Sequence, residues 1–600
     1  MNFTPILELT TSEKITLIRE DMHEFGINAY IIADADPHMS EYPADHWKCR
    51  EWLTGFCGSN GTILITAESA GLWTDSRYYE IAERAINDTE IELFKMSDIG
   101  VPSIDEWLIQ NLKSGDSVGI NTSTVSAKRF KQLQKDMNFH SINTVSCPDL
   151  TKNIWHNRPA LPVTQAYILE DEYSGESAQN KVLRVREKMR INAVEWHLVT
   201  RIDEICWLLN LRGSDVECQS LLISFLLISQ DKIILFIDDR KLNSTTIKSL
   251  EKTGINIHDY EYLKKCLKLL PSQSRIQLNP EFVNQDLYVA LSHCRILENR
   301  DIITDLKTIK NDVEINNLKK CLRYDATALV RMQIWLEESF QNKSYLSENI
   351  ISEKLYELRS QLPGYLHPSF PNIVGYNANG ALNHYFVSKE TDTELSADGG
   401  LILIDSGGTY LSGTTDTTRV FNLGEATDIQ KEDYTITLKG LINLSTATFP
   451  VGTGGAGLDA LCREPMWKHK RDFKHGTGHG VGFSLNVHEG PQNINKKCVE
   501  ELKPGMITTI EPGIYRPGEF GIRIENITLC IEDNSSVFGE FLRFETLTAF
   551  PFNIDLIKIE LLDEQEKKWI NAFHSDVIAN LGELLDTNEL NWLKNKCSQI

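Results

Sequence analysis

Four acidic residues and one histidine in the last third of the chain are candidate metal ligands. A fold in which they bind metal together must bring all five into one site. They are Asp405, Asp416, His479, Glu511 and Glu525. Such an oxygen-rich set suits a pair of hard divalent cations better than a thiolate or multi-histidine zinc site. The charges of four carboxylates and two divalent cations cancel, whereas four carboxylates without metal would repel one another. The first hypothesis is therefore a dinuclear metallohydrolase.

The sequence around these residues predicts strands that deliver them. Leu401 to Ile404 is an all-apolar run typical of a buried strand, and it ends at Asp405. Turn signals follow, and β-forming residues then resume, so a hairpin should bring Asp416 back beside Asp405. In Gly521 to Glu525, strand alternation would place Arg523 on the same face as the acidic residue two positions later. Arg523 is thus a candidate partner for a ligand carboxylate.

Two further patterns in this region have competing interpretations. His475 and His479 have the His-x-x-x-His spacing of a zinc pair, but that pair requires a helix, and glycines at 476, 478 and 480 disfavour one. Gly452 to Gly457 matches the dinucleotide pattern G-x-G-x-x-G. The residues before it look helical and not β, so we expect a turn between two helices there. No G-x-S-x-G nucleophile motif occurs.

Three more histidines lie close in sequence to the ligand candidates: His384, His475 and His488. One interpretation is that each is a structural residue held by hydrogen bonds. The other is functional, because a hydrolase needs donors for a developing oxyanion and an imidazole can supply them. Both interpretations stay open from the residues alone.

The first half of the chain contains a faint internal repeat. Trp52 and Trp207 are each followed six residues later by a Gly-Ser pair. Upstream of each lies an amphipathic helix pattern, which includes Arg19 in the first copy and Arg186 in the second, and then a strand-like run. We expect two copies of one α/β domain; the competing interpretation is chance similarity of two short motifs.

The length of 600 residues exceeds what one hydrophobic core organises, so several domains are expected. Boundaries are predicted near Arg158 and near Asp305. These give two α/β segments, 1–157 and 158–308, and a third segment, 309–600, that mixes long helices with antiparallel strands and ends in helices.

Composition excludes several classes of partner. The net charge is −23, from 61 Lys and Arg against 84 Asp and Glu, and no basic patch is visible, which argues against nucleic acid. The N-terminal residues lack the pattern of a signal peptide, and the most apolar stretch, Leu221 to Ile228, is too short to span a membrane. Twelve cysteines without a C-x-x-C motif are typical of free thiols in the cytoplasm. We therefore expect a cytoplasmic protein without a membrane partner.

The ligand candidates lie within motifs that together are specific. The catalytic segment contains Asp-Ser-Gly…Gly-Thr-Thr-Asp-x-Thr-Arg at 405–419, His-Gly-Thr-Gly-His-Gly-Val-Gly at 475–482, Asn-Val-His-Glu-Gly-Pro at 486–491, Glu-Pro-Gly-x-Tyr at 511–515 and Gly-Ile-Arg-Ile-Glu-Asn at 521–526. Two more motifs lie earlier, Trp-Thr-Asp-Ser-Arg-Tyr at 73–78 and a run from 203 to 215. With them, the chain closely resembles the Xaa-Pro aminopeptidase (aminopeptidase P) family of pita-bread metallopeptidases, in its long three-domain cytosolic form.

This resemblance implies a fold, an activity and a metal centre. The fold would be α/β and α+β, with two creatinase-like N-terminal domains before a pita-bread catalytic domain. The activity would be removal of the N-terminal residue from peptides with proline second, through attack of a dimetal-bridging hydroxide on the scissile carbonyl. Asp405 would bind one metal, His479 and Glu511 the other, and Asp416 and Glu525 would bridge both. Homodimers are common in the family.

The resemblance also implies roles for residues around the metals. Glu511 is similar to the family's proton-transfer carboxylate. His384 and His488 match positions that contact substrate and stabilise the tetrahedral intermediate, and His475 lines the pocket. Tyr515 and Arg523 match positions whose side chains orient the metal ligands without binding the metals themselves.

Three alternative functions and three candidate metals fit parts of this pattern. Ligand hardness favours Mn²⁺, whereas the affinity order favours Zn²⁺, and Co²⁺ is a third candidate. A prolidase, which splits Xaa-Pro dipeptides, shares all five ligands, but the two-domain N-terminal half favours the aminopeptidase. A metal-free creatinase-like hydrolase or a non-catalytic pita-bread binding module would be expected to lack ligand residues, and all five are present.

Overall fold

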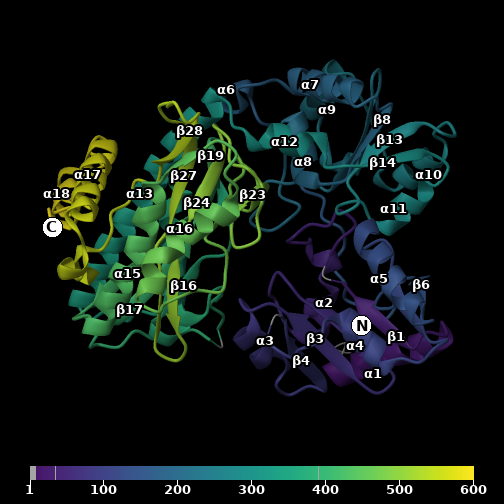
Figure 1. The fold of residues 1–600 in the computed structure, drawn as a ribbon, viewed down its shortest axis with the longest axis horizontal. Helices are drawn as coiled ribbons and strands as arrows, with labels where there is room; N and C mark the ends of the chain where they lie inside the picture. The colour runs from purple at the N-terminus through teal and green to yellow at the C-terminus, as the bar shows by residue number, and fades with distance from the viewer. Residues whose placement is uncertain (1–8, 34, 97, 390) are drawn as a thin grey trace, which may run out of the picture. The chain divides into compact units, whose positions relative to one another are not determined.

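The computed structural model describes residues 9–33, 35–96, 98–389 and 391–600, which form two compact units (Figure 1). The first unit holds the chain up to Ile302 except for two short segments. Those segments, Leu169–Ser177 and Cys218–Ser220, belong with Ile303–Ile600 in the second unit. The sequence predicts three domains with boundaries at 157 and 308, and these boundaries stay predictions. No helix among the described residues combines the length and apolar character that crossing a membrane requires.

The first unit contains two six-stranded sheets with one topology. The strand orders are β4-β3-β2-β1-β5-β6 and β12-β11-β10-β8-β13-β14, and parallel and antiparallel pairings fall at the same places in both. The strands of the first sheet are β1 (Ala29–Ile32), β2 (Thr62–Thr66), β3 (Ala70–Thr74), β4 (Ile91–Lys95), β5 (Ser117–Asn121) and β6 (Asn143–Cys147). Those of the second are β8 (Trp196–Val199), β10 (Ser224–Ser229), β11 (Ile233–Ile237), β12 (Ile255–His258), β13 (Arg275–Leu278) and β14 (Arg295–Glu298).

Helices accompany the two sheets in matching order. The first copy has α1 (Thr11–Glu24), α2 (Cys49–Thr54), α3 (Tyr79–Ile86), α4 (Ile104–Asn111) and α5 (Ala127–Phe139). The second has α7 (Ala178–Ile191), α8 (Ile202–Leu209), α9 (Ser244–Lys252), α10 (Leu263–Lys268) and α11 (Gln285–Ala290). A small ribbon of β7 (Tyr167–Ile168) and β9 (Leu211–Arg212) completes the unit. The predicted duplication of an α/β domain is therefore confirmed.

The arginines of the repeat make the same contact in each copy. Arg19 on α1 donates from Nε to the carbonyl of Thr66 at the end of β2, at 2.8 Å. Arg186 on α7 donates from Nε to the carbonyl of Ser229 at the end of β10, at 3.0 Å. Each arginine thus satisfies a carbonyl at the end of an equivalent strand, which gives the sequence similarity a structural reason.

The second unit is built from antiparallel sheets and long helices. Its strands are β15 (Tyr365–Pro368), β16 (Ile373–Tyr376), β17 (Gly400–Ser406), β18 (Gly408–Tyr410), β19 (Gly413–Thr414), β20 (Thr417–Leu423), β21 (Thr448–Pro450), β22 (Gly478–Gly480), β23 (Glu489–Ile494), β24 (Ile507–Ile510), β25 (Gly513–Arg516), β26 (Phe520–Arg523), β27 (Asn526–Glu532) and β28 (Phe541–Thr546). Its helices are α6 (Asp171–Ser174), α13 (Asp312–Gln341), α14 (Glu348–Ser360), α15 (Asp428–Ser445), α16 (Gly455–Lys468), α17 (Glu564–Leu581) and α18 (Thr587–Lys596). Helix α12 (Ile302–Thr308) begins at the last residue of the first unit.

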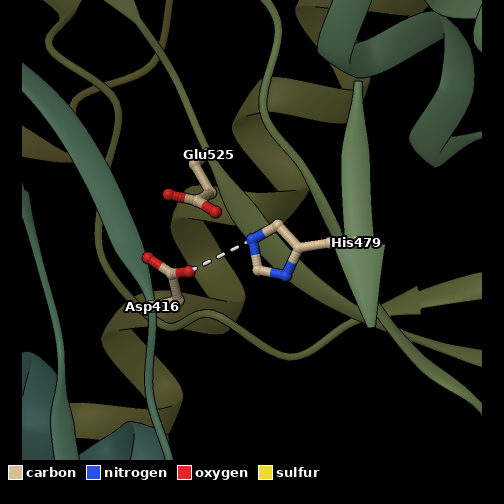
Figure 2. Close-up of side chains that lie close together, drawn as sticks. All are labelled: Asp416, His479 and Glu525. Atoms are coloured by element: carbon tan, nitrogen blue, oxygen red, sulfur yellow. Dashed lines mark ion pairs between the residues drawn. The ribbon is translucent and has the colours of Figure 1, made fainter. Parts of the chain in front are cut away.

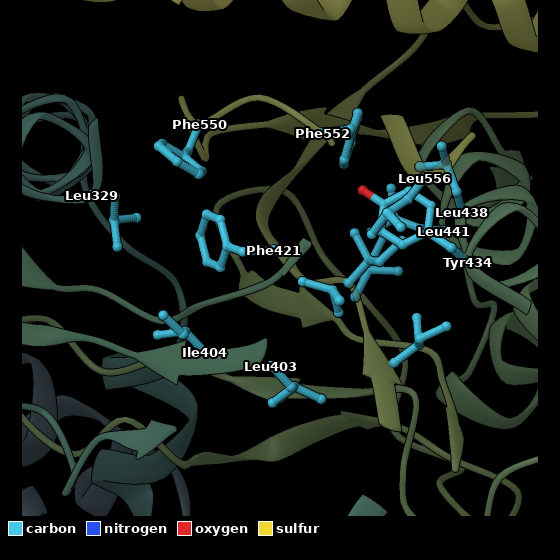
Figure 3. Close-up of a cluster of buried hydrophobic side chains, with 14 of the residues drawn as sticks. Leu329, Leu403, Ile404, Phe421, Tyr434, Leu438, Leu441, Phe550, Phe552 and Leu556 are labelled. Atoms are coloured by element: carbon cyan, nitrogen blue, oxygen red, sulfur yellow. The ribbon is translucent and has the colours of Figure 1, made fainter. Parts of the chain in front are cut away.

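A large hydrophobic core packs against the strands that lead to the site. Leu403 and Ile404 on β17 are each 1% exposed, and their cluster includes Phe421 on β20 and Tyr434 on α15 (Figure 3). Adjacent residues of one strand normally face opposite sides of a sheet, so both faces of β17 are covered here. The predicted buried strand is confirmed, and its rigid end carries Asp405.

The glycine-rich segment 452–457 differs from the expected turn between two helices. A short strand, β21, follows α15, and α16 begins at Gly455, inside the segment. Gly455 approaches the carbonyl of Asn493 so closely that a Cβ there would lie 1.8 Å from that oxygen. Gly455 therefore serves close backbone packing at the start of a helix.

The C-terminal tail, where helices are expected, forms α17 and α18.

Candidate active site

The first two acidic residues come from neighbouring antiparallel strands. Asp405 lies near the end of β17, directly opposite Thr418 on β20, and Asp416 immediately precedes β20. Gly407 lies in the connection, and a Cβ there would come within 1.9 Å of the carbonyl oxygen of Thr415. The antiparallel pairing of β17 and β20 confirms that the chain turns back and brings Asp416 beside Asp405. Only glycine permits the close approach at position 407.

His479 lies on β22, between two glycines that allow its strand to pack closely. A Cβ on Gly478 would meet the Thr509 carbonyl oxygen at 1.9 Å, and one on Gly480 would meet the Glu489 carbonyl oxygen at 2.2 Å. The segment is a strand and not a helix, as the glycines predict. His479 Nδ1 lies 2.9 Å from its neighbour's carbonyl oxygen at Gly480, to which it donates. That hydrogen bond leaves the Nε2 lone pair available to a metal.

Glu511 and Glu525 each lie at a break between strands. Glu511 falls between β24 and β25, and its amide donates to the Thr477 carbonyl at 2.7 Å. Glu525 falls between β26 and β27, and its amide donates to the Thr418 carbonyl at 3.1 Å. The Thr418 hydroxyl also donates to Glu525 Oε2 at 2.7 Å. The predicted alternation is confirmed, because Arg523 and Glu525 both face the site while the two isoleucines beside them lie in the core, although β26 itself ends at Arg523.

Three of these residues, Asp416, His479 and Glu525, point toward one another (Figure 2). One ligand atom from each of Asp416, His479 and Glu525 lies within 4.8 Å of the other two. His479 Nε2 lies 3.5 Å from Asp416 Oδ2 and 3.7 Å from Glu511 Oε1. Asp405 is close enough to raise the pKa of Asp416, Glu511 and Glu525 through its charge. All five predicted residues are therefore gathered around a single site.

The electrostatics of the site call for positive charge. Burial, followed by the charges of Asp405 and Glu511, raises the pKa of Asp416 well above its usual range. Burial, followed by the charge of Asp416, does the same to the pKa of Glu525. Asp405 Oδ1 is buried and has no hydrogen-bond partner among the described residues. This donor set fits divalent cations, which would neutralise the carboxylates and satisfy the buried oxygen.

A hydrogen-bonded relay supports the carboxylates from one side. Arg523 Nη2 donates to Asp405 Oδ2 at 2.5 Å, and its Nη1 donates to the Tyr515 hydroxyl at 2.9 Å. The same hydroxyl lies 2.8 Å from His475 Nε2. Burial raises the pKa of Tyr515 to about 12, so the phenol stays protonated and bridges the two partners. Arg523 thus contacts the ligand candidate Asp405 directly, and Tyr515 and His475 connect to it through Arg523; the roles of these three residues stay predictions.

Replacing Tyr515 by phenylalanine is expected to lower kcat at saturating metal by about 10- to 100-fold, because removal of an outer partner loosens Arg523 and Asp405. Tyr434→Phe is the matched control. Tyr434 is also buried, and its hydroxyl accepts from the Asn553 amide at 2.9 Å. Equal kcat values for the two variants, measured with the metal saturating, would contradict the role of the relay.

The remaining predicted histidines differ in how firmly the structure places them. His488 lies beside the metal-ligand set, with its ring centroid 4.4 Å from that of His479 and the rings at 76°. His384 lies half-buried in the loop after the 3₁₀ helix Asn377–Ala381. That loop is held by Tyr385, whose hydroxyl donates to the buried Glu348 at 2.7 Å. A substrate contact by His384 stays a prediction.

Sequence reasoning missed several residues that shape the site. Thr418 and Arg419 lie inside the motif at 405–419, but the motif by itself does not indicate what they contact. Arg419 donates to the Glu525 carbonyl at 2.5 Å and to Asn526 Oδ1 at 2.9 Å. Asp459 and Arg463, on α16, lie outside the quoted sequence motifs. The motif could have indicated the first two residues, whereas the α16 pair depends on packing that no local pattern reveals.

Four family models match almost the whole chain. Two Creatinase/Prolidase N-terminal domain models match residues 14–154 and 157–314. Metallopeptidase family M24 matches residues 316–532, and the C-terminal region of peptidase M24 matches residues 540–600. All five candidate ligands therefore fall inside the M24 match.

Relatives of similar length carry one kind of name. A probable Xaa-Pro aminopeptidase P from Laccaria bicolor is 36% identical, over 99% of this chain and 94% of that protein. Xaa-Pro aminopeptidase 1 from Dictyostelium discoideum is 34% identical, over 99% of this chain and 97% of that protein. Both similarities extend through the N-terminal half as well as the catalytic segment.

Solved structures separate the long aminopeptidases from shorter relatives. X-prolyl aminopeptidase from Caenorhabditis elegans, described as a cytosolic enzyme with a di-nuclear active site, superposes with a TM-score of 0.95 at 31% identity, covering 99% of this chain and all of that one. An Xaa-Pro dipeptidase from Bacillus anthracis shares only the fold, with a TM-score of 0.50 at 24% identity over 63% of this chain and 99% of that one. The chain therefore belongs to metallopeptidase family M24 and, within it, to the long Xaa-Pro aminopeptidases.

Proposed function

We propose that this protein removes the N-terminal residue from peptides whose second residue is proline. The observation that carries the proposal is the set of four carboxylates gathered with His479, in a chain that matches long Xaa-Pro aminopeptidases along its full length. Two divalent cations held by these five residues would supply a nucleophilic hydroxide near neutral pH and charge stabilisation for a hydrolytic transition state.

The side chains around the cluster have distinct proposed roles. Asp405 would hold one cation, His479 and Glu511 would hold the other, and Asp416 and Glu525 would contribute to both. Burial raises the pKa of Glu511, which suits a carboxylate that takes a proton and returns it to the leaving proline nitrogen.

The histidines are proposed to act on the substrate. His488 is proposed to donate a hydrogen bond to the developing oxyanion, and its ring contact with His479 supports this role. His384 is proposed to contact the substrate from its loop, and His475, held by Tyr515, to line the pocket. A proline imide has no N–H for a peptidase to bind, so recognition through the free amine and the carbonyl suits this substrate.

Further proposals concern the protein as a whole. The three segments 1–157, 158–308 and 309–600 are proposed as two creatinase-like domains and a catalytic domain. Ligand hardness supports Mn²⁺ as the native metal. The C. elegans relative supports a cytosolic location, and a homodimer is proposed from the family resemblance, which sedimentation velocity would test.

Peptide length and sequence test the proposal against a prolidase. The Mn²⁺-loaded protein is expected to release the first residue from an Xaa-Pro-Xaa tripeptide and to leave the matched Xaa-Ala-Xaa tripeptide largely intact. Cleavage of the Xaa-Pro dipeptide alone would mean a prolidase. If none of the three peptides is cleaved while metal is bound, the non-catalytic binding module becomes the better account.

A further inference from the structure

A buried arginine on α16 directs both terminal nitrogens of its guanidinium toward the start of the metal-binding segment. Arg463 is 1% exposed. Its Nη1 donates to Asp472 Oδ1 at 2.6 Å and to the Phe473 carbonyl at 2.7 Å, and its Nη2 donates to the His475 carbonyl at 2.8 Å. The guanidinium also stacks 3.7 Å from the centroid of the Phe473 ring. Arg463 therefore holds residues 472–475 by two hydrogen bonds to the backbone, one to the Asp472 side chain and one ring contact.

Asp459, one turn earlier on the same helix, extends this hold along the segment. Its Oδ2 accepts from Arg463 Nε at 2.8 Å, and its Oδ1 accepts from the Thr477 hydroxyl at 2.6 Å. The Thr477 carbonyl in turn accepts from the Glu511 amide at 2.7 Å. Two side chains on α16 thus fix the backbone at positions 475 and 477 and, through Thr477, the backbone of Glu511.

This arrangement is more than a helix-stabilising ion pair. A surface i,i+4 pair on a helix would use one bond and remain solvated, whereas this one is buried and costly unless all its groups are satisfied. Here the satisfying partners belong to the segment that carries His475 and His479. We propose that Arg463 and Asp459 are positioning residues that set the place of His479 and Glu511 in the metal centre. The inference rests on the proposed function only for what the centre does, since the contacts themselves predict an effect on metal binding.

Arg463→Lys tests the proposal, because lysine keeps the charge but cannot span four acceptors in a planar fork. Metal-stripped full-length protein is titrated with Mn²⁺ by calorimetry. The expected result is a Kd raised by about 10- to 100-fold, the range for lost outer partners of metal ligands. At saturating Mn²⁺, kcat for an Xaa-Pro-Xaa tripeptide should fall, with KM changed less than kcat.

Arg359→Lys is the matched control. Arg359 is equally buried, and it pairs with Asp325 through two bonds of 2.8 and 3.0 Å on helices α14 and α13. Both variants are expected to lose thermal stability, but only Arg463→Lys should lose Mn²⁺ affinity. The proposal is overturned if Arg463→Lys binds Mn²⁺ as tightly as Arg359→Lys does.

Thr477→Val provides a second test should Arg463→Lys fail to fold. Valine keeps the volume and removes only the hydroxyl that donates to Asp459. A Kd for Mn²⁺ about tenfold above that of the wild type supports the proposal, and a wild-type Kd overturns it. If the wild type cleaves no Xaa-Pro peptide, the proposed function fails, yet these Mn²⁺ affinities still decide the positioning role.

Discussion

Glu525→Gln is expected to lower kcat for an Xaa-Pro-Xaa tripeptide by on the order of a thousandfold, even at saturating Mn²⁺. A carboxylate proposed to bridge two cations becomes a neutral amide, which removes a charge both cations need. Stabilisation by a metal centre amounts to several kcal/mol, and each tenfold in rate corresponds to about 1.4 kcal/mol. Steady-state release of the first residue, with Mn²⁺ occupancy measured in parallel, provides the value.

Asp325→Asn is the control for this substitution. Asp325 is also a buried carboxylate of the second unit, and it accepts from Arg359 and from the Tyr410 hydroxyl at 2.6 Å. The Asp325→Asn variant should have a lower free energy of unfolding than the wild type, but its folded molecules should keep most of the wild-type kcat. The account is contradicted if Glu525→Gln retains activity comparable to that of Asp325→Asn.

The same Glu525→Gln substitution is expected to raise the thermal stability of the metal-free protein at neutral pH. Burial, and then Asp416, raises the pKa of Glu525 in the folded protein, while the unfolded chain keeps an ordinary value of about 4. Between those two values the folded state holds more protons, so its stability falls as the pH rises. Glutamine removes one member of the repelling set and this penalty with it.

The sign of this effect reverses with metal, which makes the measurement specific. Without metal, Tm of the variant should exceed that of the wild type, with the gap growing from pH 5 to pH 7. A change of one kcal/mol moves Tm by about 2–4 °C in domains of 150–250 residues. With saturating Mn²⁺ the wild type should be the more stable, because it binds metal more tightly. A metal-free variant that melts below the wild type at pH 7 would contradict the electrostatic account.

Local patterns in the sequence predicted much of the site. Asp405 follows an apolar run and Asp416 follows glycine turns, so strand and hairpin geometry place both side chains without long-range information. The glycines around His479 likewise excluded a helix and indicated close backbone approach. The faint repeat was predictive because Arg19 and Arg186 bond carbonyls at equivalent strand ends.

Long-range packing set the limit of prediction. Nothing near Arg463 distinguishes it from other arginines on amphipathic helices, and its partners became visible only once α16 was packed against residues 472–477. Glu525 was expected within a continuous strand, whereas bonds from Thr418 and Arg419, more than a hundred residues earlier, hold it at a break. The segment Cys218–Ser220 belongs to the second unit although it lies within the second α/β repeat of the sequence. No local pattern in the sequence predicts this assignment.

The central claim is that Asp405, Asp416, His479, Glu511 and Glu525 form one metal centre that cleaves Xaa-Pro peptides. Its most direct test is a titration of metal-stripped protein with Mn²⁺, in which bound metal and release of the first residue from an Xaa-Pro-Xaa tripeptide are followed together. The account predicts no activity without metal and full activity as the bound Mn²⁺ approaches two ions per chain. Tripeptide cleavage that persists in the stripped protein, or two bound ions without any cleavage, would contradict it.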